Sequence, residues 1–183
     1  MMKLEAERVI LREWKEEDVE PFAKINQDPK VMEFMPKLLT KQEVNEWIER
    51  IKLHFKNNNF GMFACELKET KKFIGYIGLQ NVAFEASFTP CVEVAWRLAS
   101  DHWGKGLATE GAKRVLEFAF NDLKLKEVLA FTVPKNLPSR RVMEKLGMTH
   151  DPKENFNHPK LPLEHPLSLH VLYRIKEDFF NKP

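Results

Sequence analysis

The sequence predicts an α/β fold, in which one mixed β-sheet carries helices on both of its faces. The main observation is that strand-like and helix-like segments alternate along the chain in the order β-α-α-β-β-β-α-β-α-β. A second is the composition, 43% hydrophobic and 31% charged residues, which is typical of a soluble globular protein. Because no repeat, low-complexity tract or linker interrupts the 183 residues, we expect a single domain over residues 1–183.

The first third of the chain predicts one strand and two helices. Residues 9–11 form a short apolar run, and apolar residues recur at helical spacing over residues 15–26. Thr40 and Glu43 have the pattern of a capping box, in which a hydroxyl and a carboxylate satisfy the free amides at a helix start. The helix that follows has one apolar face and ends at the three asparagines of residues 57–59.

The middle third predicts a hairpin, a strand and a long helix. Residues 60–67 and 72–79 are rich in β-forming types and flank a polar four-residue turn. Residues 91–98 predict another strand. From about residue 104 to residue 123, apolar side chains line one stripe of a helix.

The last third predicts a strand, a helix, a loop and a closing strand. Residues 127–133 are strand-like, and a helix follows over residues 136–146. Asn136 can cap that helix, Pro138 suits its first turn, and Gly147 suits a left-handed stop. Residues 150–166 carry four prolines and no periodicity, so we expect a loop there, and residues 168–175 predict the closing strand.

Charge and cysteine content exclude several classes of protein. The net charge of +2 comes from 29 basic and 27 acidic residues, which gives no electrostatic footprint for nucleic acid or for an anionic membrane surface. No run approaches the ~18 apolar residues of a membrane span, and the N-terminus lacks the apolar core of a signal peptide. Cys65 and Cys91 lie in strand-like runs without metal-ligand spacing, so we expect no metal, two buried free thiols and a cytoplasmic location.

The most informative stretch is a strand that runs through a loop with two glycines, Gly104 and Gly106, directly into a helix. Glycine lets the backbone approach a ligand closely and adopt torsions that other residues resist. The first amides of a helix have no intrahelical partners, and the helix dipole is positive there. Together these features predict a phosphate or pyrophosphate site, to which Lys105 adds a charge and Thr109 a hydroxyl donor.

The same stretch is compatible with an ordinary tight turn, and two known nucleotide-binding motifs also place glycines before a helix. A nucleotide P-loop needs four residues between its first glycine and a Gly-Lys-Ser/Thr end, which nothing here matches. The dinucleotide fingerprint needs a third glycine where Thr109 stands. The tight turn remains an alternative on these residues alone.

The segment Trp103-Gly104-Lys105-Gly106-Leu107-Ala108 resembles the pyrophosphate loop of the GNAT superfamily, whose pattern is Gln/Arg-x-x-Gly-x-Gly/Ala. Trp103 replaces the usual Gln or Arg, which is typical of the RimJ/RimL branch, and Glu110 continues that branch's pattern. A second motif of the superfamily is Asn-x-x-Ser/Ala, then a helix, then Glu-Lys-x-Gly-Phe; the chain matches it from Asn136 to Gly147 and has Met148 at the last position. The resemblance extends from Arg8 to about Tyr173.

The resemblance implies a mixed, mostly antiparallel sheet in which two neighbouring parallel strands, residues 91–98 and 127–133, splay apart. The pantetheine arm of acetyl-CoA lies in the wedge between such strands and bonds to their backbone, as an added strand does. No metal is implied. The residues that the resemblance assigns to acetyl-CoA are Trp96, Leu98, Trp103, Gly104, Lys105, Gly106, Leu107, Ala108, Thr109, Asn136 and Ser139.

The activity implied is direct attack of a neutral amine on the acetyl thioester. The tetrahedral oxyanion needs a donor, for which a strand amide near residues 94–96 is the expected source. The departing thiolate needs a proton. Many relatives supply it from a tyrosine at the position of Met143, which has no proton to donate. The RimJ/RimL pattern therefore points to Ser139, whose alternative role is to serve the first helical turn.

For the general base, Glu93 on the strand beside the thioester is the candidate, with a solvated or salt-bridged Glu93 as the alternative. His170 and Glu164 are weaker candidates, because a lone histidine on a strand more often has a structural role. His102 precedes the phosphate loop and is expected to shape it. An acceptor α-amine, with a pKa near ~7.8, needs less help from a base than a lysine-like amine at ~10.4.

Three functions stay open at this point. We expect an acetyltransferase whose acceptor is a protein or peptide N-terminus. The segments that form the acceptor site in relatives, here residues 34–39, 84–90 and 156–166, are rich in aromatic residues and proline rather than in acidic ones. A polyamine or aminoglycoside would favour more carboxylates than Glu154 and Glu164 offer. The alternatives are a small-molecule amine acetyltransferase and a non-catalytic acetyl-CoA-binding domain, and the sequence does not indicate an oligomeric state.

Overall fold

The computed structural model describes residues 2–180, which form two compact units. Unit 1 consists of residues 2–80 and 95–115, and unit 2 of residues 81–94 and 116–180. Strand β5 (Val92–Leu98) and helix α3 (Leu107–Asn121) each contribute residues to both units. The expected single domain therefore stays a prediction.

Unit 1 holds the first strands and helices of the chain. Its strands pair in the order β1-β2-β3-β4, with β5 next to β4. The first three pairings are antiparallel and place Leu4 opposite Leu11, Leu11 opposite Cys65, and Phe63 opposite Ile77. The elements are β1 (Lys3–Glu5), β2 (Val9–Arg12), the 3₁₀ turn η1 (Glu16–Asp18), α1 (Val19–Gln27), α2 (Lys41–Asn58), β3 (Met62–Leu67), β4 (Phe73–Asn81) and η2 (Ser100–His102).

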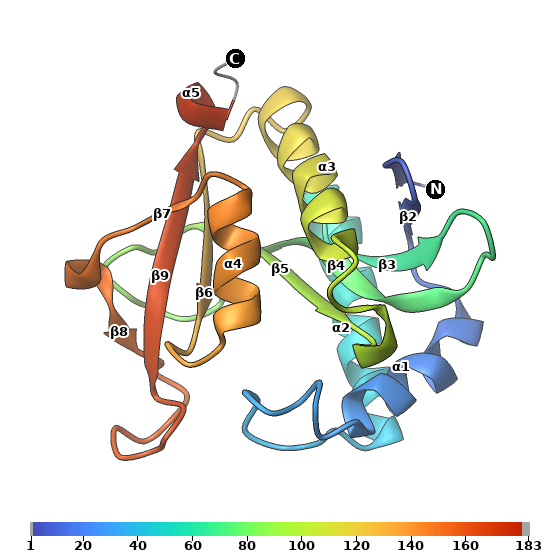
Figure 1. Cartoon of the computed structure of the whole chain (residues 1–183), viewed down its shortest axis with the longest axis horizontal. Helices are drawn as coiled ribbons and strands as arrows, with labels where there is room; N and C mark the ends of the chain where they lie inside the picture. The colour runs from blue at the N-terminus through green and yellow to red at the C-terminus, as the bar shows by residue number, and fades with distance from the viewer. Residues whose placement is uncertain (1, 181–183) are drawn as a thin grey trace. The chain divides into compact units, whose positions relative to one another are not determined.

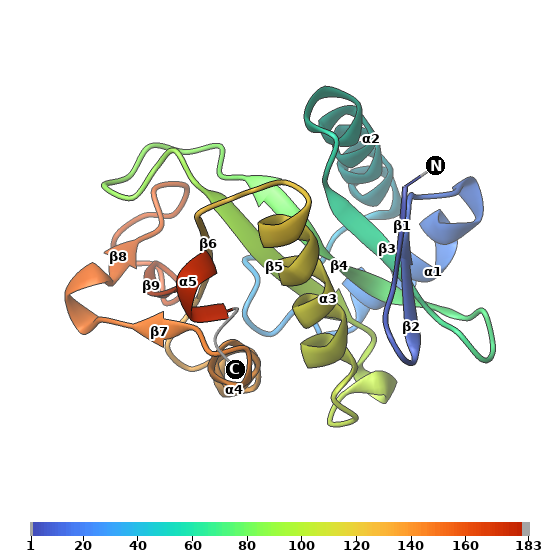
Figure 2. The same cartoon turned by 90° about the horizontal axis from the view of Figure 1, so that it is seen from above.

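Both faces of the unit 1 sheet are covered by helices, as predicted. On one face, apolar side chains of α1 and α2 pack with Trp14 and with alternate residues of β3 and β4. On the other face, α3 approaches so closely that a Cβ on Gly111 would lie 2.4 Å from the Ile77 side chain. Figure 2 shows α2 and α3 on opposite sides of β3 and β4. The two helix layers hold β4 and the adjoining half of β5 in place.

Unit 2 contains the only parallel strand pair among the described residues. There β5 pairs with β6 (Glu127–Thr132), with Glu93 opposite Leu129. The strand order continues from β6 to β9 (Leu169–Lys176) and β7 (Thr149–His150), and β8 (Phe156–Asn157) also pairs with β9. Helix α4 (Leu137–Lys145) lies beside β6 (Figure 1). The mixed, mostly antiparallel sheet with one parallel pair is confirmed.

Local sequence signals located several element ends correctly. Thr40 caps α2 by accepting from the Glu43 amide, and the Glu43 carboxylate accepts from the Thr40 amide at 2.8 Å. Asn136 caps α4, and Gly147 takes the left-handed conformation with φ +80°. These ends depend on hydrogen bonds between residues close in sequence, which is why the sequence predicts them.

Three expectations were wrong in their details. Helix α3 begins at Leu107 rather than at Gly104, because the two glycines adopt left-handed torsions that a helix excludes. Residues 150–166 are not simply a loop: β7, the 3₁₀ turn η3 (Pro152–Glu154) and β8 lie there, and both strands pair with β9. Strand β1 and the terminal helix α5 (Glu177–Phe180) were not expected at all. Across residues 2–180, no helix is long and apolar enough to span a membrane.

Candidate active site

The loop before α3 has the geometry of an anion-binding turn. Gly104 and Gly106 have φ values of +73° and +77°, a region that favours glycine. Within the described chain, no protein acceptor takes a hydrogen bond from the backbone amides of residues 104–109. The first amide of this run to pair is that of Glu110, which donates to the Gly106 carbonyl at 3.0 Å. Six amides thus remain available to a phosphate group where the dipole of α3 is positive.

Arg8 holds this loop against the start of β2. Its Nη1 donates to the Lys105 carbonyl at 2.9 Å, and its Nε donates to the Glu110 carboxylate at 2.7 Å. The Arg8 backbone amide donates to the same carboxylate at 2.6 Å. Glu110 was expected as part of a motif, but its partner was not, because nothing local indicates a contact across 102 residues.

Trp103 and His102 join the loop to the strand before it. The Trp103 indole N–H donates to the Leu98 carbonyl at 2.8 Å. This bond holds the Trp103 ring against the end of β5, and both residues are predicted to contact acetyl-CoA. Lys105 donates to the Asp101 carbonyl at 2.8 Å and remains exposed. The His102 side chain is buried, and burial lowers its pKa, which the nearby Asp101 carboxylate partly opposes. These contacts fit the expected role of His102 in shaping the loop.

The second motif lies in unit 2, at the end of β6. The Asn136 side chain accepts from the Ser139 amide at 3.3 Å and donates to the Thr132 hydroxyl at 2.9 Å. The half-buried Ser139 makes no bond from its hydroxyl to the described chain, so this proton is available. Met143 is buried, at 3% exposure, and its side chain has no proton to donate. The predicted role of Ser139 as a proton donor therefore stays a prediction that this geometry allows.

Glu93 lies on β5 opposite Leu129 and is buried, with 7% of its surface exposed. Partners in a sheet register point to the same face, and residues two apart along a strand share that face. By this alternation Glu93, Leu129 and Phe131 point to one face of the unit 2 sheet. The opposite face carries Tyr173, whose hydroxyl accepts from Arg140 and donates to Glu144 of α4, each at 3.1 Å.

An aromatic cluster covers the face that Glu93 shares. Its members come from the β4–β5 loop, β6, β8 with the following residue, and β9: Phe84, Phe88, Phe131, Phe156, His158 and His170. Ring centroids are 4.8 Å apart for Phe84 and His158, and 5.1 Å apart for His158 and His170. All six rings are half-buried, so the cluster presents part of its surface to solvent. Two of the three segments expected at the acceptor site thus meet here.

The two histidines of the cluster have opposite tautomers in their neutral forms. His170 Nδ1 lies 3.0 Å from the Ser168 carbonyl, which only accepts, so this nitrogen carries the proton. His158 Nδ1 accepts from the Lys160 amide at 3.3 Å, so its proton is on Nε2. Burial lowers the pKa of both imidazoles, and for His158 the neighbouring His170 and Lys160 lower it further. His170 therefore presents a free electron pair on Nε2.

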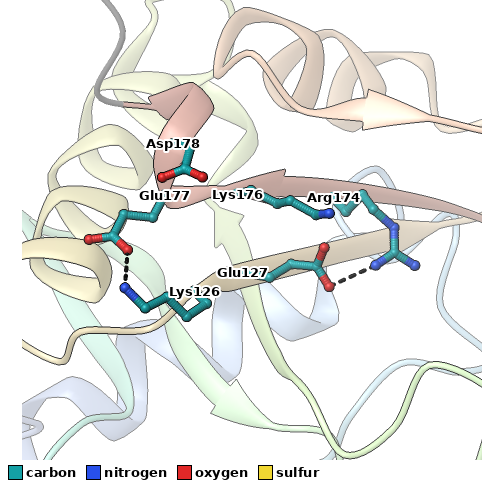
Figure 3. Close-up of a pocket in the computed structure, with 6 residues that line it drawn as sticks. All are labelled: Lys126, Glu127, Arg174, Lys176, Glu177 and Asp178. Carbon is teal, nitrogen blue, oxygen red and sulfur yellow. Dashed lines mark hydrogen bonds and ion pairs between the residues drawn. The ribbon is translucent and has the colours of Figure 1, made fainter.

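A separate hollow of about 670 Å³ lies at the opposite end of β6 from Thr132. Figure 3 shows its charged lining, in which Arg174 pairs with Glu127 at 2.7 Å and Lys126 with Glu177 at 2.6 Å. Arg174 also donates to Glu154 at 3.0 Å. Most of these charges neutralise one another, so the hollow does not extend the site. The described residues contain no group of three or more His, Cys, Asp or Glu side chains placed to hold a metal ion.

Comparisons with known proteins agree with this geometry. Residues 8–149 match the family described as Acetyltransferase (GNAT) domain. The uncharacterized protein YkkB of Bacillus subtilis is 31% identical over 147 residues, which are 80% of this chain and 84% of YkkB. A GNAT-family acetyltransferase of Bacillus anthracis superposes with a TM-score of 0.78 at 26% identity and covers 97% of this chain and 99% of its own.

A further solved structure is Mycobacterium smegmatis RimJ in complex with CoA-disulfide. It superposes with a TM-score of 0.80 at 18% identity, over 99% of this chain and 90% of RimJ. At 18% identity, this similarity shows a shared fold and nothing more. The structural neighbours thus include the RimJ/RimL type that the loop sequence resembles.

Proposed function

Because the chain belongs to the GNAT family of N-acetyltransferases, we propose that it transfers the acetyl group of acetyl-CoA to the α-amine at the N-terminus of a protein or peptide. The observation that carries this choice is the character of the aromatic cluster. Its rings are uncharged at neutral pH, since burial lowers the pKa of both histidines. Glu154, one carboxylate that a polycationic acceptor could use, is bound by Arg174.

An aromatic, uncharged surface suits a single amine attached to a peptide. A polyamine or an aminoglycoside carries several positive charges and needs several free carboxylates to balance them. A peptide N-terminus carries one amine of pKa near ~7.8, part of which is already neutral at physiological pH. The likeness in fold to RimJ is consistent with this proposal.

The proposed roles of the residues follow the two motifs. The free amides of residues 104–109 hold the pyrophosphate of acetyl-CoA, with Lys105 adding positive charge. The roles predicted for Trp96, Leu98 and Asn136 in holding the pantetheine arm stay predictions. When bound, acetyl-CoA supplies an acetyl thioester to the amine.

Ser139 gives a proton or hydrogen bond to the thiolate that departs, which its unpaired hydroxyl permits. The place of Glu93 beside the thioester and its role as a base both stay predictions. The two free cysteines fit the reducing cytoplasm in which we place the protein, with Cys65 buried and Cys91, contrary to expectation, only half-buried.

A panel of acceptors tests the proposal. Acetyl-CoA is incubated with the protein and with peptides that begin in Ala, Ser or Met, or with spermidine, an aminoglycoside or free amino acids. Release of the CoA thiol is followed, and mass spectrometry locates the acetyl group. We expect peptides to be acetylated on the α-amine, and N-terminally blocked copies of the same peptides to be inert. Faster turnover of spermidine or the aminoglycoside would contradict the proposed acceptor, and acetyl-CoA binding without turnover of any amine would indicate a non-catalytic domain.

A further inference from the structure

The aromatic cluster contains a proton acceptor that the two family motifs do not include. His170 stands on β9 one residue before Val171, which pairs with Thr132 at the end of β6. Asn136 of the second motif bonds to the same Thr132. His170 therefore lies at the end of β6 where the second motif begins.

The orientation of His170 follows from the strand register. Phe131 pairs with Leu172, and His170 is two residues from Leu172, so both rings point to one face of the sheet. Their centroids are 6.0 Å apart, and the ring of Phe156 on β8 lies 5.5 Å from His170. This is the face that Glu93 shares, whereas α4 with Ser139 belongs to the other face. If the amine loses its proton on one face and the thiolate gains a proton on the other, the proton acceptor and the proton donor must be different residues.

The chemical state of His170 suits proton removal from an amine. Its Nδ1–H is held by the Ser168 carbonyl, so the orientation of the ring and the free pair on Nε2 are both fixed. Within residues 2–180, no hydrogen bond reaches Nε2. The groups that face it from β6 and β8 are the uncharged rings of Phe131 and Phe156, and the only titratable neighbour in the described part of the cluster is His158, with Lys160 behind it.

Glu93 is the competing base on this face. An imidazole is a proton acceptor matched to neutral pH. Glu93 is also more buried than the half-buried His170. Both considerations favour the histidine.

We propose that His170 Nε2 accepts the proton that the attacking amine loses, and that the aromatic cluster is the surface on which the amine-bearing residue lies. This proposal rests on the proposed acetyl transfer. As the amine nitrogen bonds to the acetyl carbon, the carbon–sulfur bond breaks. The proton from nitrogen passes to His170, while the Ser139 hydroxyl donates a proton to the thiolate and regains one from solvent. The histidine then returns its proton to solvent, so protons are conserved and the reaction needs no oxidant or reductant.

Nuclear magnetic resonance of the whole chain, labelled with ¹⁵N-histidine, tests the state of His170 without any acceptor. The signals are assigned with the variants His170→Asn and His170→Phe. We expect a neutral imidazole with the proton on Nδ1 at pH 7, and binding of acetyl-CoA should leave that tautomer in place. A charged ring, or a proton on Nε2, would overturn the proposal.

Kinetics with a peptide acceptor test the role itself. His170→Asn keeps a donor for the Ser168 carbonyl, and His170→Phe keeps the ring packing, so the two variants preserve different contacts. His150→Gln is the matched control, because His150 is a half-buried histidine of β7 that stacks on Tyr173, on the opposite face of the sheet from the cluster. We expect both His170 variants to lose about 10²-fold in kcat/KM at pH 7. The loss should shrink as the pH rises above the pKa of the amine, while acetyl-CoA affinity and Tm stay near the parent values.

Two failures are distinguishable. If the parent protein acetylates peptides and both folded variants match it within twofold at every pH, the base assignment is wrong while the proposed function stands. If the parent binds acetyl-CoA and acetylates no amine, the proposed function fails and the assignment with it.

Discussion

The Arg8 side chain donates to the Glu110 carboxylate at 2.7 Å, and this pair fixes the start of α3 to the residue before β2. The same guanidinium donates to the Lys105 carbonyl inside the phosphate loop. The pair is partly exposed, with 49% and 16% of the two side chains accessible, so its contribution to global stability is small. Its main effect is to hold the loop in one conformation, which lowers the ordering cost of binding an anion.

Glu110→Gln should therefore weaken acetyl-CoA binding more than it weakens the fold. Loss of charge-assisted bonds worth about 0.5–1.5 kcal/mol corresponds to about 2- to 12-fold in affinity. Isothermal titration calorimetry measures the affinity, and Lys113→Met, an exposed change on the same helix, is the control. An unchanged affinity in Glu110→Gln would show that the loop needs no such support.

Gly106→Glu should abolish measurable binding of acetyl-CoA. A carboxylate at the closest approach of the backbone repels the pyrophosphate, and the positive φ at residue 106 disfavours any side chain. Gly106→Gln has nearly the same size without the charge, so the difference between the two variants isolates the electrostatic part. That difference should shrink as salt is added. Micromolar binding by a folded Gly106→Glu variant would argue against the proposed pyrophosphate site.

Asp18→Asn should destabilise the protein by about 3 kcal/mol. Arg12 is buried between two carboxylates, donating to Asp18 at 2.7 and 2.8 Å and to Glu66 at 2.7 Å. Removal of one carboxylate leaves part of a buried positive charge uncompensated. Urea unfolding gives the loss in stability, and Glu49→Gln, which breaks the exposed pair with Lys52, should change it by less than about 1 kcal/mol. Equal effects of the two variants would contradict this account.

Ser139→Ala should reduce kcat by about 10²-fold while acetyl-CoA affinity and Tm hardly change. Its hydroxyl has no hydrogen-bond partner in the described chain, so no structural bond is lost. Asn136→Ala is the contrasting variant, since it removes the cap of α4 and the bond to Thr132, and should cost about 1 kcal/mol of stability. Steady-state kinetics with a peptide acceptor measure kcat of both variants. Full activity in Ser139→Ala would show that the serine is not the proton donor.

Acid should destabilise the parent protein more than it destabilises His170→Phe. Burial lowers the pKa of His170 in the folded state, so the unfolded chain binds more protons as the pH falls below the ordinary value near 6.5. Stability from the neutral ring is thus present at pH 7.5 and is lost toward pH 5. Thermal unfolding at both pH values should show a smaller fall in Tm for His170→Phe than for the parent protein, and equal falls would contradict this account.

Local signals account for much of what the sequence predicted correctly. The capping pair of Thr40 and Glu43, the Asn136 cap and the Gly147 stop involve residues within a few positions of one another. The two-glycine loop before α3 is likewise contiguous, so its torsions and free amides depend on neighbouring residues, while its binding of phosphate stays a prediction. The start of α3 was placed too early, because left-handed torsions at glycine do not show in a composition pattern.

Features built from distant segments could not be predicted in this way. Strand β8 forms because Phe156 pairs with His170 of β9, whereas the prolines on either side of it predict a loop. The aromatic cluster joins four separate segments, and the contact between Arg8 and Glu110 spans 102 residues. A single sequence contains the participants in such contacts but not their pairing.

The division of β5 and α3 between the two units has a consequence for how the protein is made on the ribosome. Unit 1 needs no residue beyond 115, whereas unit 2 draws on residues up to 180. Vectorial synthesis therefore completes unit 1 before unit 2, with residues 104–110 among the last residues of unit 1 to emerge. Residues 81–94 of unit 2 leave the exit tunnel before any residue of β6, so the parallel pair of β5 and β6 forms only after the chain has grown past residue 127.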